Sequence, residues 1–218
     1  MTTILAAVLL ELFTSQGCSS CPPADELLRA LSRDAALEGK IIPLSFHVDY
    51  WNRIGWQDPF SSADWSRRQK EYAAAFRQGR VYTPQLVING RAELVGSDER
   101  AIRREIARQI ALSSKVHLWF DVARQSGGYT VTVRTEAPAE LRDRLAIYAV
   151  TYENELVTKV GRGENGGRTL RNDFVVRAFR EVAGGRATLP AGPADGIVVF
   201  AQDRKTRAIY AATRRTLR

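Results

Sequence analysis

Hydrophobic and polar positions follow two different periods along the chain, and the change comes near residue 113. Before it, nearly continuous apolar runs typical of buried strands alternate with segments that repeat apolar positions at helical spacing. The predicted elements, in order, are strand 5–13, helix 24–38, strand 41–48, helix 65–78, strand 85–89, a short strand near 92–95 and helix 98–112. This order is typical of a small α/β domain.

After residue 113 the helical period disappears, and short alternating segments separated by glycine, proline and asparagine turns replace it. The predicted strands lie near 115–123, 128–136, 145–152, 156–160, 173–182, 197–202 and 207–213. Seven strands at this spacing favour a β-sandwich. The sequence therefore predicts an α/β domain over residues 1–113 followed by an all-β, sandwich-like domain over residues 114–218.

The composition of the chain bears on whether it folds and whether it crosses a membrane. The chain has 218 residues, of which 44% are hydrophobic and 26% charged, so it is able to bury a core. No apolar stretch is long enough to span a membrane, and the apolar run before Glu11 lacks both a preceding positive charge and a cleavage site. We therefore expect no transmembrane segment and no signal peptide in this chain.

The net charge of +8 lies almost wholly after residue 113, which raises the question of an acidic partner or an anionic surface there. The arginines are spread over many strands, as on an ordinary solvated face. No recognition helix or aromatic RNA motif accompanies them, so we expect no nucleic-acid partner.

The two cysteines of the chain, Cys18 and Cys21, form a Cys-x-x-Cys motif with Ser19 and Ser20 between them. The motif lies between a predicted strand and a predicted helix, where the helix dipole favours a thiolate at Cys18. With two residues between them, Cys21 is able to resolve a mixed disulfide formed by Cys18. A structural or metal-binding pair is the alternative. The redox interpretation requires the two sulfurs to lie together at an accessible bend.

The residues around this motif resemble a known family. Residues 13–21 resemble the active-site turn of glutaredoxins and thioredoxins, and residues 83–98 resemble their cis-proline strand and the start of their last helix. More closely, residues 11–25, 47–51, 82–90 and 163–168 resemble the usually exported bacterial family called domain of unknown function 1223. The resemblance implies a thioredoxin-like first half, a redox-competent cysteine pair and a periplasmic or exported location. The family has no established substrate.

The same resemblance implies a cis bond between Thr83 and Pro84, with the backbone of Thr83 free to pair with an extended substrate. In the minimal glutaredoxin-like sheet, the strand over 41–48 lies at an edge, where Pro43 is tolerated. The largest departure from the family pattern is a second proline after Cys21, which predicts that Cys21 and Pro22 are not yet helical.

Acidic residues before and after the cysteines affect their predicted proton chemistry. Asp25 and Glu26 fall in the first turn of the predicted helix, where they repel a nearby thiolate, so we predict a mildly acidified Cys18 with a pKa above about 5. Glu11 is a charge within an apolar strand. It is a candidate proton acceptor for Cys21, unless its side chain leaves the strand's buried face.

Trp51, Trp56 and Trp65 fall within fifteen residues, beside Tyr50 and Phe60. Such a cluster suits an apolar lip for an extended substrate near the cysteines, and it suits a satellite core or a domain interface equally well. Trp51 is therefore a candidate supporting residue of the site.

Two further patterns point to ligands only weakly. Residues 161–166 match G-x-G-x-x-G, but no helix follows to bind a pyrophosphate, so a mobile glycine-rich loop, packed at the domain interface, is the better interpretation. His47 and His117 lie in different predicted domains, which argues against a zinc site. Copper(I) on the two thiolates is a remaining alternative.

Together the sequence predicts a thiol-disulfide oxidoreductase that acts on protein or peptide thiols through Cys18 and Cys21, with Thr83 and Pro84 presenting backbone to the substrate. No cofactor and no metal are predicted. The alternatives are a non-catalytic binding protein with a thioredoxin-like scaffold and a basic β half, and a copper-handling thiol protein.

Overall fold

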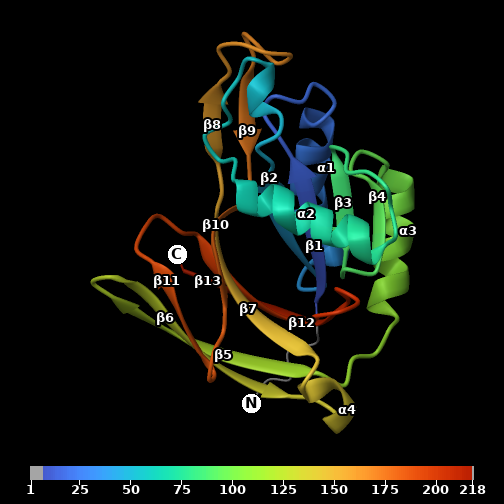
Figure 1. Cartoon of the computed structure of the whole chain (residues 1–218), viewed down its shortest axis with the longest axis vertical. Helices are drawn as coiled ribbons and strands as arrows, with labels where there is room; N and C mark the ends of the chain where they lie inside the picture. The colour runs from blue at the N-terminus through green and yellow to red at the C-terminus, as the bar shows by residue number, and fades with distance from the viewer. Residues whose placement is uncertain (1–6, 218) are drawn as a thin grey trace.

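The computed structural model describes residues 7–217 and contains a large mixed sheet, two smaller antiparallel sheets and four α-helices among those residues (Figure 1). The large sheet has the strand order β13-β12-β7-β10-β2-β1-β3-β4. Its strands are β1 (Val8–Thr14), β2 (Ile41–His47), β3 (Gln85–Ile88), β4 (Ala92–Val95), β7 (Leu145–Glu153), β10 (Val175–Glu181), β12 (Gly196–Asp203) and β13 (Ile209–Thr216). The predicted mixture of α and β structure is thus confirmed.

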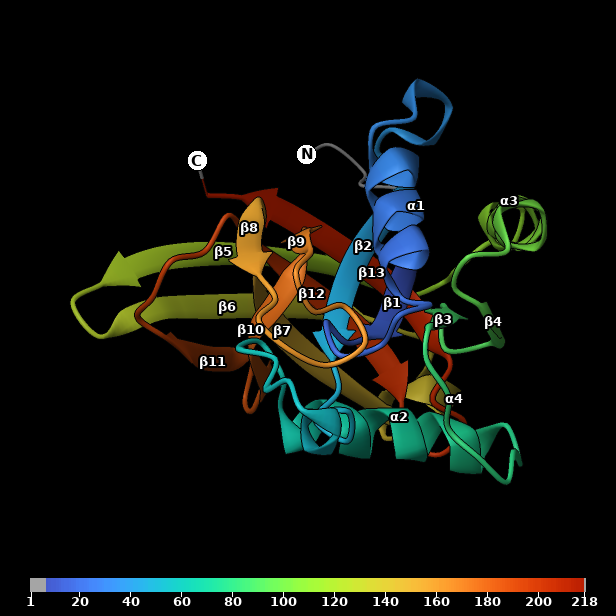
Figure 2. The ribbon, with the colours of Figure 1, turned by 90° about the horizontal axis from the view of Figure 1, so that it is seen from above.

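Helices cover both faces of the half of this sheet that contains β1. Helices α1 (Pro22–Ser32) and α3 (Glu99–Ile110) lie on one face and α2 (Ala63–Ala75) lies on the other (Figure 2). Because both faces are covered, every residue of β1 and β2 is buried, which explains their continuous apolar runs. Ser62 caps α2 and Asp98 caps α3 with side-chain oxygens.

The other half of the large sheet is covered by strands. A three-stranded sheet of order β11-β6-β5 packs on β7, β12 and β13 through a second apolar core that includes Leu118, Val131, Leu189, Ile197 and Val199. Its strands are β5 (His117–Gln125), β6 (Gly128–Glu136) and β11 (Arg186–Pro190). The short helix α4 (Ala139–Arg142) precedes β7.

The third sheet is a hairpin of β8 (Leu156–Lys159) and β9 (Thr169–Asn172). It lies at the same end of the molecule as the segment that joins β1 to α1 and as the short 3-10 helix η2 (Asn52–Ile54) (Figure 1). A second 3-10 helix, η1 (Ala35–Leu37), follows α1. This end of the molecule carries the candidate site.

Strands from both sides of residue 113 belong to the one large sheet, because β10 pairs with β2 at Val175 and Ser45. The expectation that the strand with Pro43 lies at a sheet edge is therefore wrong. Proline is tolerated there because Ser45 is the residue whose backbone N–H bonds Phe174, and β10 begins too late to reach Pro43. The division into domains at residue 113 stays a prediction.

The seven strands predicted after residue 113 are all present. The sequence missed β9, β11 and α4. The first strand begins at Val8, after Ala7, and residues 5 and 6 of the predicted segment 5–13 lie outside the described residues.

Candidate functional site

Cys18 and Cys21 lie in the turn between β1 and α1 and are joined by a disulfide, with 5.4 Å between their Cα atoms. The turn is held by its own backbone, since Cys18 N–H donates to Ser15 O and Cys21 N–H donates to Cys18 O. Cys21 has helical backbone angles (φ −78°, ψ −38°), and α1 begins at Pro22. The expectation that both residues are not yet helical is therefore wrong, because the first helical positions need no N–H donor and so accept proline.

Both cysteines are fully buried, with 0% of either residue exposed, whereas Ser19 and Ser20 between them are exposed. The redox interpretation required the sulfurs to lie at an accessible bend, and the structure does not meet this requirement. The Sγ atom of Cys18 lies 3.4 Å from the Ser20 hydroxyl. The turn itself reaches the surface, and the sulfurs face inward beneath neighbouring segments.

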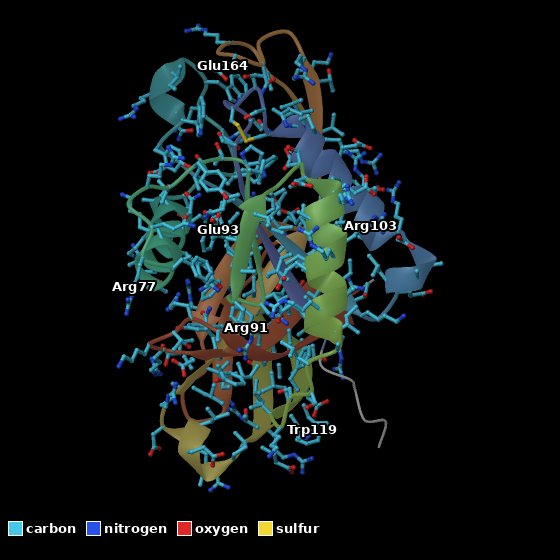
Figure 3. All side chains as sticks on the ribbon, turned by 90° about the vertical axis from the view of Figure 1, so that its right-hand side faces the viewer. Arg77, Arg91, Glu93, Arg103, Trp119 and Glu164 are labelled. Carbon is cyan, nitrogen blue, oxygen red and sulfur yellow. A yellow bond between two sulfur atoms is a disulfide. The ribbon has the colours of Figure 1, made fainter. Side chains whose placement is uncertain are left out.

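The tip of the β8–β9 hairpin, residues 161–167, is hydrogen-bonded to the cysteine turn. The Asn165 amide donates to the carbonyl oxygens of Gln16 and Cys18, both at 2.9 Å, and Asn165 is itself fully buried. The Glu164 carboxylate accepts the backbone N–H of Ser19 at 2.9 Å. Figure 3 labels Glu164 at the end of the molecule that also holds the disulfide, which is drawn in yellow. Hydrogen bonds from Ser19 lower the pKa of Glu164.

Trp56 contacts both the hairpin tip and the cysteine turn. Its ring lies against Gly161, and its Nε1–H donates to the side-chain oxygen of Gln16 at 3.2 Å. Gln16 in turn donates to Asn172 at the end of β9. The G-x-G-x-x-G segment is thus the hairpin tip, packed on the cysteine turn, and β9 follows it in place of a helix.

The Thr83-Pro84 bond is cis, as the family resemblance implies. Two contacts place it beside the cysteine turn. The Trp51 indole N–H donates to the Thr83 hydroxyl at 2.8 Å, and the Cβ of Trp51 lies next to Gly17, directly before Cys18. Gly96 lies between Pro84 and Ala24, a residue of the first turn of α1.

The aromatic segment divides between the core and the site. Trp65 is buried and packs on Phe46 and Phe179, so it belongs to the core. Trp51 and Trp56 contact the segments around the cysteine turn instead, and Ile54 between them is 47% exposed. A role of these residues as a lip for substrate stays a prediction.

Glu11 is buried in the centre of β1 and is bound by residues of α2. The guanidinium of Arg68 donates to Glu11 at 2.7 Å, and the Tyr72 hydroxyl donates to its other oxygen. Burial raises the pKa of Tyr72, and Glu11 raises it further although Arg68 lowers it. Gln202 of β12 also bonds Tyr72, so Glu11 belongs to a buried network across the sheet. Its predicted action on Cys21 has no contact in support among the described residues.

A second acid–base cluster, which the sequence did not reveal, lies beside the turn. His47 at the end of β2 pairs through Nδ1 with Asp58 at 2.7 Å, and both side chains are fully buried. Asp58 also accepts the backbone N–H of Gln16. The Thr14 hydroxyl donates to Asp25 of α1, and Asp25 interacts electrostatically with His47.

These contacts set the protonation of the cluster. Burial raises the pKa of Asp25 from 3.8 to about 7, although the charge of His47 lowers it. Burial is the largest single effect and lowers the pKa of His47, but the carboxylate and hydrogen bond of Asp58 together with the charge of Asp25 raise the pKa overall. Burial is also the largest single effect on Asp58 and raises its pKa, but His47 together with the backbone N–H groups of Gln16 and Phe60 lowers the pKa overall. A carboxyl group that titrates near neutral pH thus lies one helical turn after Cys21.

No cluster of three or more possible metal ligands occurs in the part of the chain that the structure describes. His47 bonds Asp58, and His117 lies on β5 beside Trp119. With both cysteines in the disulfide, a copper(I) ion requires the reduced protein. None of the helices in residues 7–217 is both long and apolar enough to cross a bilayer.

Many basic residues of the second half are paired. Arg144 pairs with Asp203, Arg177 with Glu153 and Arg204 with Glu181. These pairs reduce the charge available to an acidic partner, and such a partner stays a prediction.

Two solved structures are similar to this chain. A protein of Agrobacterium tumefaciens, solved by X-ray crystallography, is 29% identical, with a TM-score of 0.73 over 96% of this chain and 94% of that chain. HBP35 of Porphyromonas gingivalis is 16% identical, with a TM-score of 0.71 over 100% of this chain and 77% of that chain, a likeness of fold alone. No curated protein matches. The model of the family described as "Protein of unknown function (DUF1223)" matches residues 9–206, so the resemblance seen in the sequence is confirmed and the chain belongs to that family.

Proposed function

We propose that the protein is a thiol-disulfide oxidoreductase that exchanges electrons with protein or peptide thiols through Cys18 and Cys21. Because both cysteines are fully buried, this proposal requires the segments around the turn to move before the sulfurs react. The observation that carries this proposal is the disulfide at the junction of β1 and α1, beside the cis Thr83-Pro84 bond. As an oxidant, the disulfide is attacked by a substrate thiolate, Cys21 leaves as the displaced sulfur, and a second substrate thiol releases Cys18. Two thiols are thereby oxidised to a disulfide, and the pair is reduced to two thiols.

The arrangement of the first half supports this proposal. The strand order β2-β1-β3-β4, with β2 parallel and β3 antiparallel to β1 and helices on both faces, is what a thioredoxin-like fold requires. We propose that residues up to about 113 form such a unit and that the later strands form a sandwich-like addition to it. An exported location belongs to the same proposal, because disulfides persist in oxidising compartments.

The residues of the turn receive roles accordingly. Cys18 is the sulfur proposed to form the mixed disulfide and Cys21 the one that resolves it, while Ser19 and Ser20 shape the turn and Ser20 contacts the Cys18 sulfur. Thr83 and Pro84 present backbone to the substrate, and Trp51 positions Thr83 through its indole N–H.

A non-catalytic binding protein is the second candidate, and the complete burial of both sulfurs favours it. In that case the disulfide stabilises the turn, and the basic second half recognises an acidic partner. A disulfide that does not exchange under any solution condition that preserves the fold supports this candidate.

Alkylation of the cysteines across a graded glutathione buffer separates the two. An exchanging pair gives a single two-electron transition, and a Cys21→Ser variant accumulates a mixed disulfide at Cys18. Insulin reduction by the wild type, compared with Cys18→Ser, then measures catalysis. A pair that stays oxidised throughout the buffer series, with insulin reduction no faster than in Cys18→Ser, refutes the proposed function.

A further inference from the structure

The tip of the β8–β9 hairpin is held on the cysteine turn by hydrogen bonds in which each polar group of the Asn165 side chain has a partner. Asn165 uses its amide group twice, on the carbonyls of Gln16 and Cys18, and its own oxygen accepts from Arg168 at 2.8 Å. A fully buried amide with every group paired contributes stability to one defined position of the hairpin. These paired hydrogen bonds therefore hold the hairpin tip in one defined position on the cysteine turn.

The backbone of the tip fits this position. A Cβ atom on Gly163 would lie 3.3 Å from the Cβ of Trp56, and Gly163 has a φ of +75°, which favours glycine. Gly167 has a φ of +82° and ends the tip. The glycines therefore allow the tip to lie flat on Trp56 and the cysteine turn, and their conformational freedom also allows it to leave.

The charge of Glu164, an exposed residue of the tip, gives a physical reason for the tip to respond to the redox state of the cysteines. The Glu164 carboxylate accepts the N–H of Ser19, the residue directly after Cys18. In the disulfide Cys18 carries no charge, and the carboxylate is stable there. After reduction, a Cys18 thiolate in the same turn repels the carboxylate. The disulfide form therefore favours the closed tip, and the dithiol form favours its release.

We propose that Glu164 and Asn165 determine which thiols react with the Cys18–Cys21 disulfide, because the hairpin tip over residues 161–167 must leave the turn before a protein thiol reaches the sulfurs. This inference rests on the proposed function. While the tip is closed, neither cysteine is exposed, and a protein thiol needs a larger displacement of the tip than a small-molecule thiol does. Each reduction consumes two thiols and forms one disulfide between them, and the displaced sulfurs of the pair take up protons.

The test compares reduction rates of the disulfide by dithiothreitol, glutathione and a reduced, unfolded protein such as ribonuclease A, measured by quenched alkylation and mass spectrometry. Asn165→Ala removes the two hydrogen bonds, Glu164→Gln removes the charge, and Lys159→Gln is the matched control on the exposed side of β8. We expect Asn165→Ala to accelerate the reaction with the protein thiol about tenfold, which corresponds to 1.4 kcal/mol. The rate with dithiothreitol changes much less, and Lys159→Gln behaves as the wild type.

Glu164→Gln keeps the inference testable if Asn165→Ala does not fold. It removes the repulsion, so we expect a lower pKa of the Cys18 thiol, measured from thiolate absorbance at 240 nm, and slower release of the tip on reduction, measured by hydrogen exchange at Gly167. Equal rates for all thiols in wild type and variants, with normal exchange in the glutathione buffer, refute the gate and leave the proposed function intact. If no thiol reduces the disulfide in the wild type or in any variant, both the gate and the proposed function are refuted.

Discussion

Replacing Asp25 with asparagine is expected to stabilise the oxidised protein at pH 8 and to leave its stability nearly unchanged at pH 4. Burial raises the pKa of Asp25 to about 7 in the folded protein, against an ordinary value of 3.8. The folded state therefore binds the Asp25 proton more tightly than the unfolded state does. Stability from this group is fully present below pH 3.8 and is lost as the pH rises through about 7.

The magnitude follows from the size of the shift. About three pKa units correspond to about 4 kcal/mol at most, since one unit is worth about 1.36 kcal/mol. The Asp25 side chain is only partly buried by surface area, so solvent screens part of this penalty and we expect about 1 to 2 kcal/mol. Asparagine has the same shape, and its oxygen is able to accept the hydrogen bond from Thr14.

Urea denaturation of wild type and Asp25→Asn at pH 4, 6 and 8, with the disulfide intact, measures the difference. The gain in unfolding free energy should grow between pH 4 and pH 8. Glu26→Gln is the matched control, because Glu26 is an exposed neighbour on the same helical turn, and it should change stability by less than about 0.5 kcal/mol. A loss of stability in Asp25→Asn at pH 8, or a difference independent of pH, would refute the reasoning.

Three further outcomes test the structure at separate points. Glu11→Gln leaves the charge of Arg68 buried without its carboxylate, so urea denaturation should show a loss of about 3 to 5 kcal/mol; a loss below about 1 kcal/mol would contradict the buried network. A methyl group on Gly90 would lie 1.9 Å from a backbone carbonyl oxygen, so Gly90→Ala should lower the free energy of unfolding by about 3 kcal/mol or more. Gly39 has a φ of +70° and open space around it, so the control Gly39→Ala should lower it by about 1 kcal/mol. Similar losses in both variants would count against the fold of the β3–β4 turn. In the reduced protein, the Cys18 thiol should titrate above pH 5 when followed by absorbance at 240 nm, and a lower value would mark a strong oxidant.

Local pattern predicted most of the elements because they are long and regularly periodic. It missed β11, which ends at Pro190, since a proline in a short run argues against a strand. The structure places β11 at the edge of its sheet, where the missing N–H faces no partner. It missed β9 because Thr169–Asn172 has only four residues, two of them exposed, and pairs with β8 alone.

The candidate site was predictable only as far as its residues are adjacent in sequence. The cysteine motif and the cis bond came from local residue patterns and the family resemblance. The contacts that hold the cysteine turn come from Asn165, which lies 147 residues from Cys18, and from Trp56 and Asp58, which are close to it only in space. Asn165 carried a local signal in the glycine-rich segment around it, and Trp56 carried one in the aromatic cluster. Asp58 carried none, and neither signal indicated the contacts with Gln16 and Cys18.

If the hairpin tip gates the cysteines as proposed, the buried disulfide and the tip influence each other in both directions. If reduction weakens the contact between Glu164 and Ser19, then by linkage any partner that pulls the tip away stabilises the reduced pair by the same free energy. A protein that binds the opened hairpin would therefore raise the reduction potential of the cysteines without touching either sulfur. The burial that argues against an openly accessible active site thus becomes a means of making the exchange conditional on a partner.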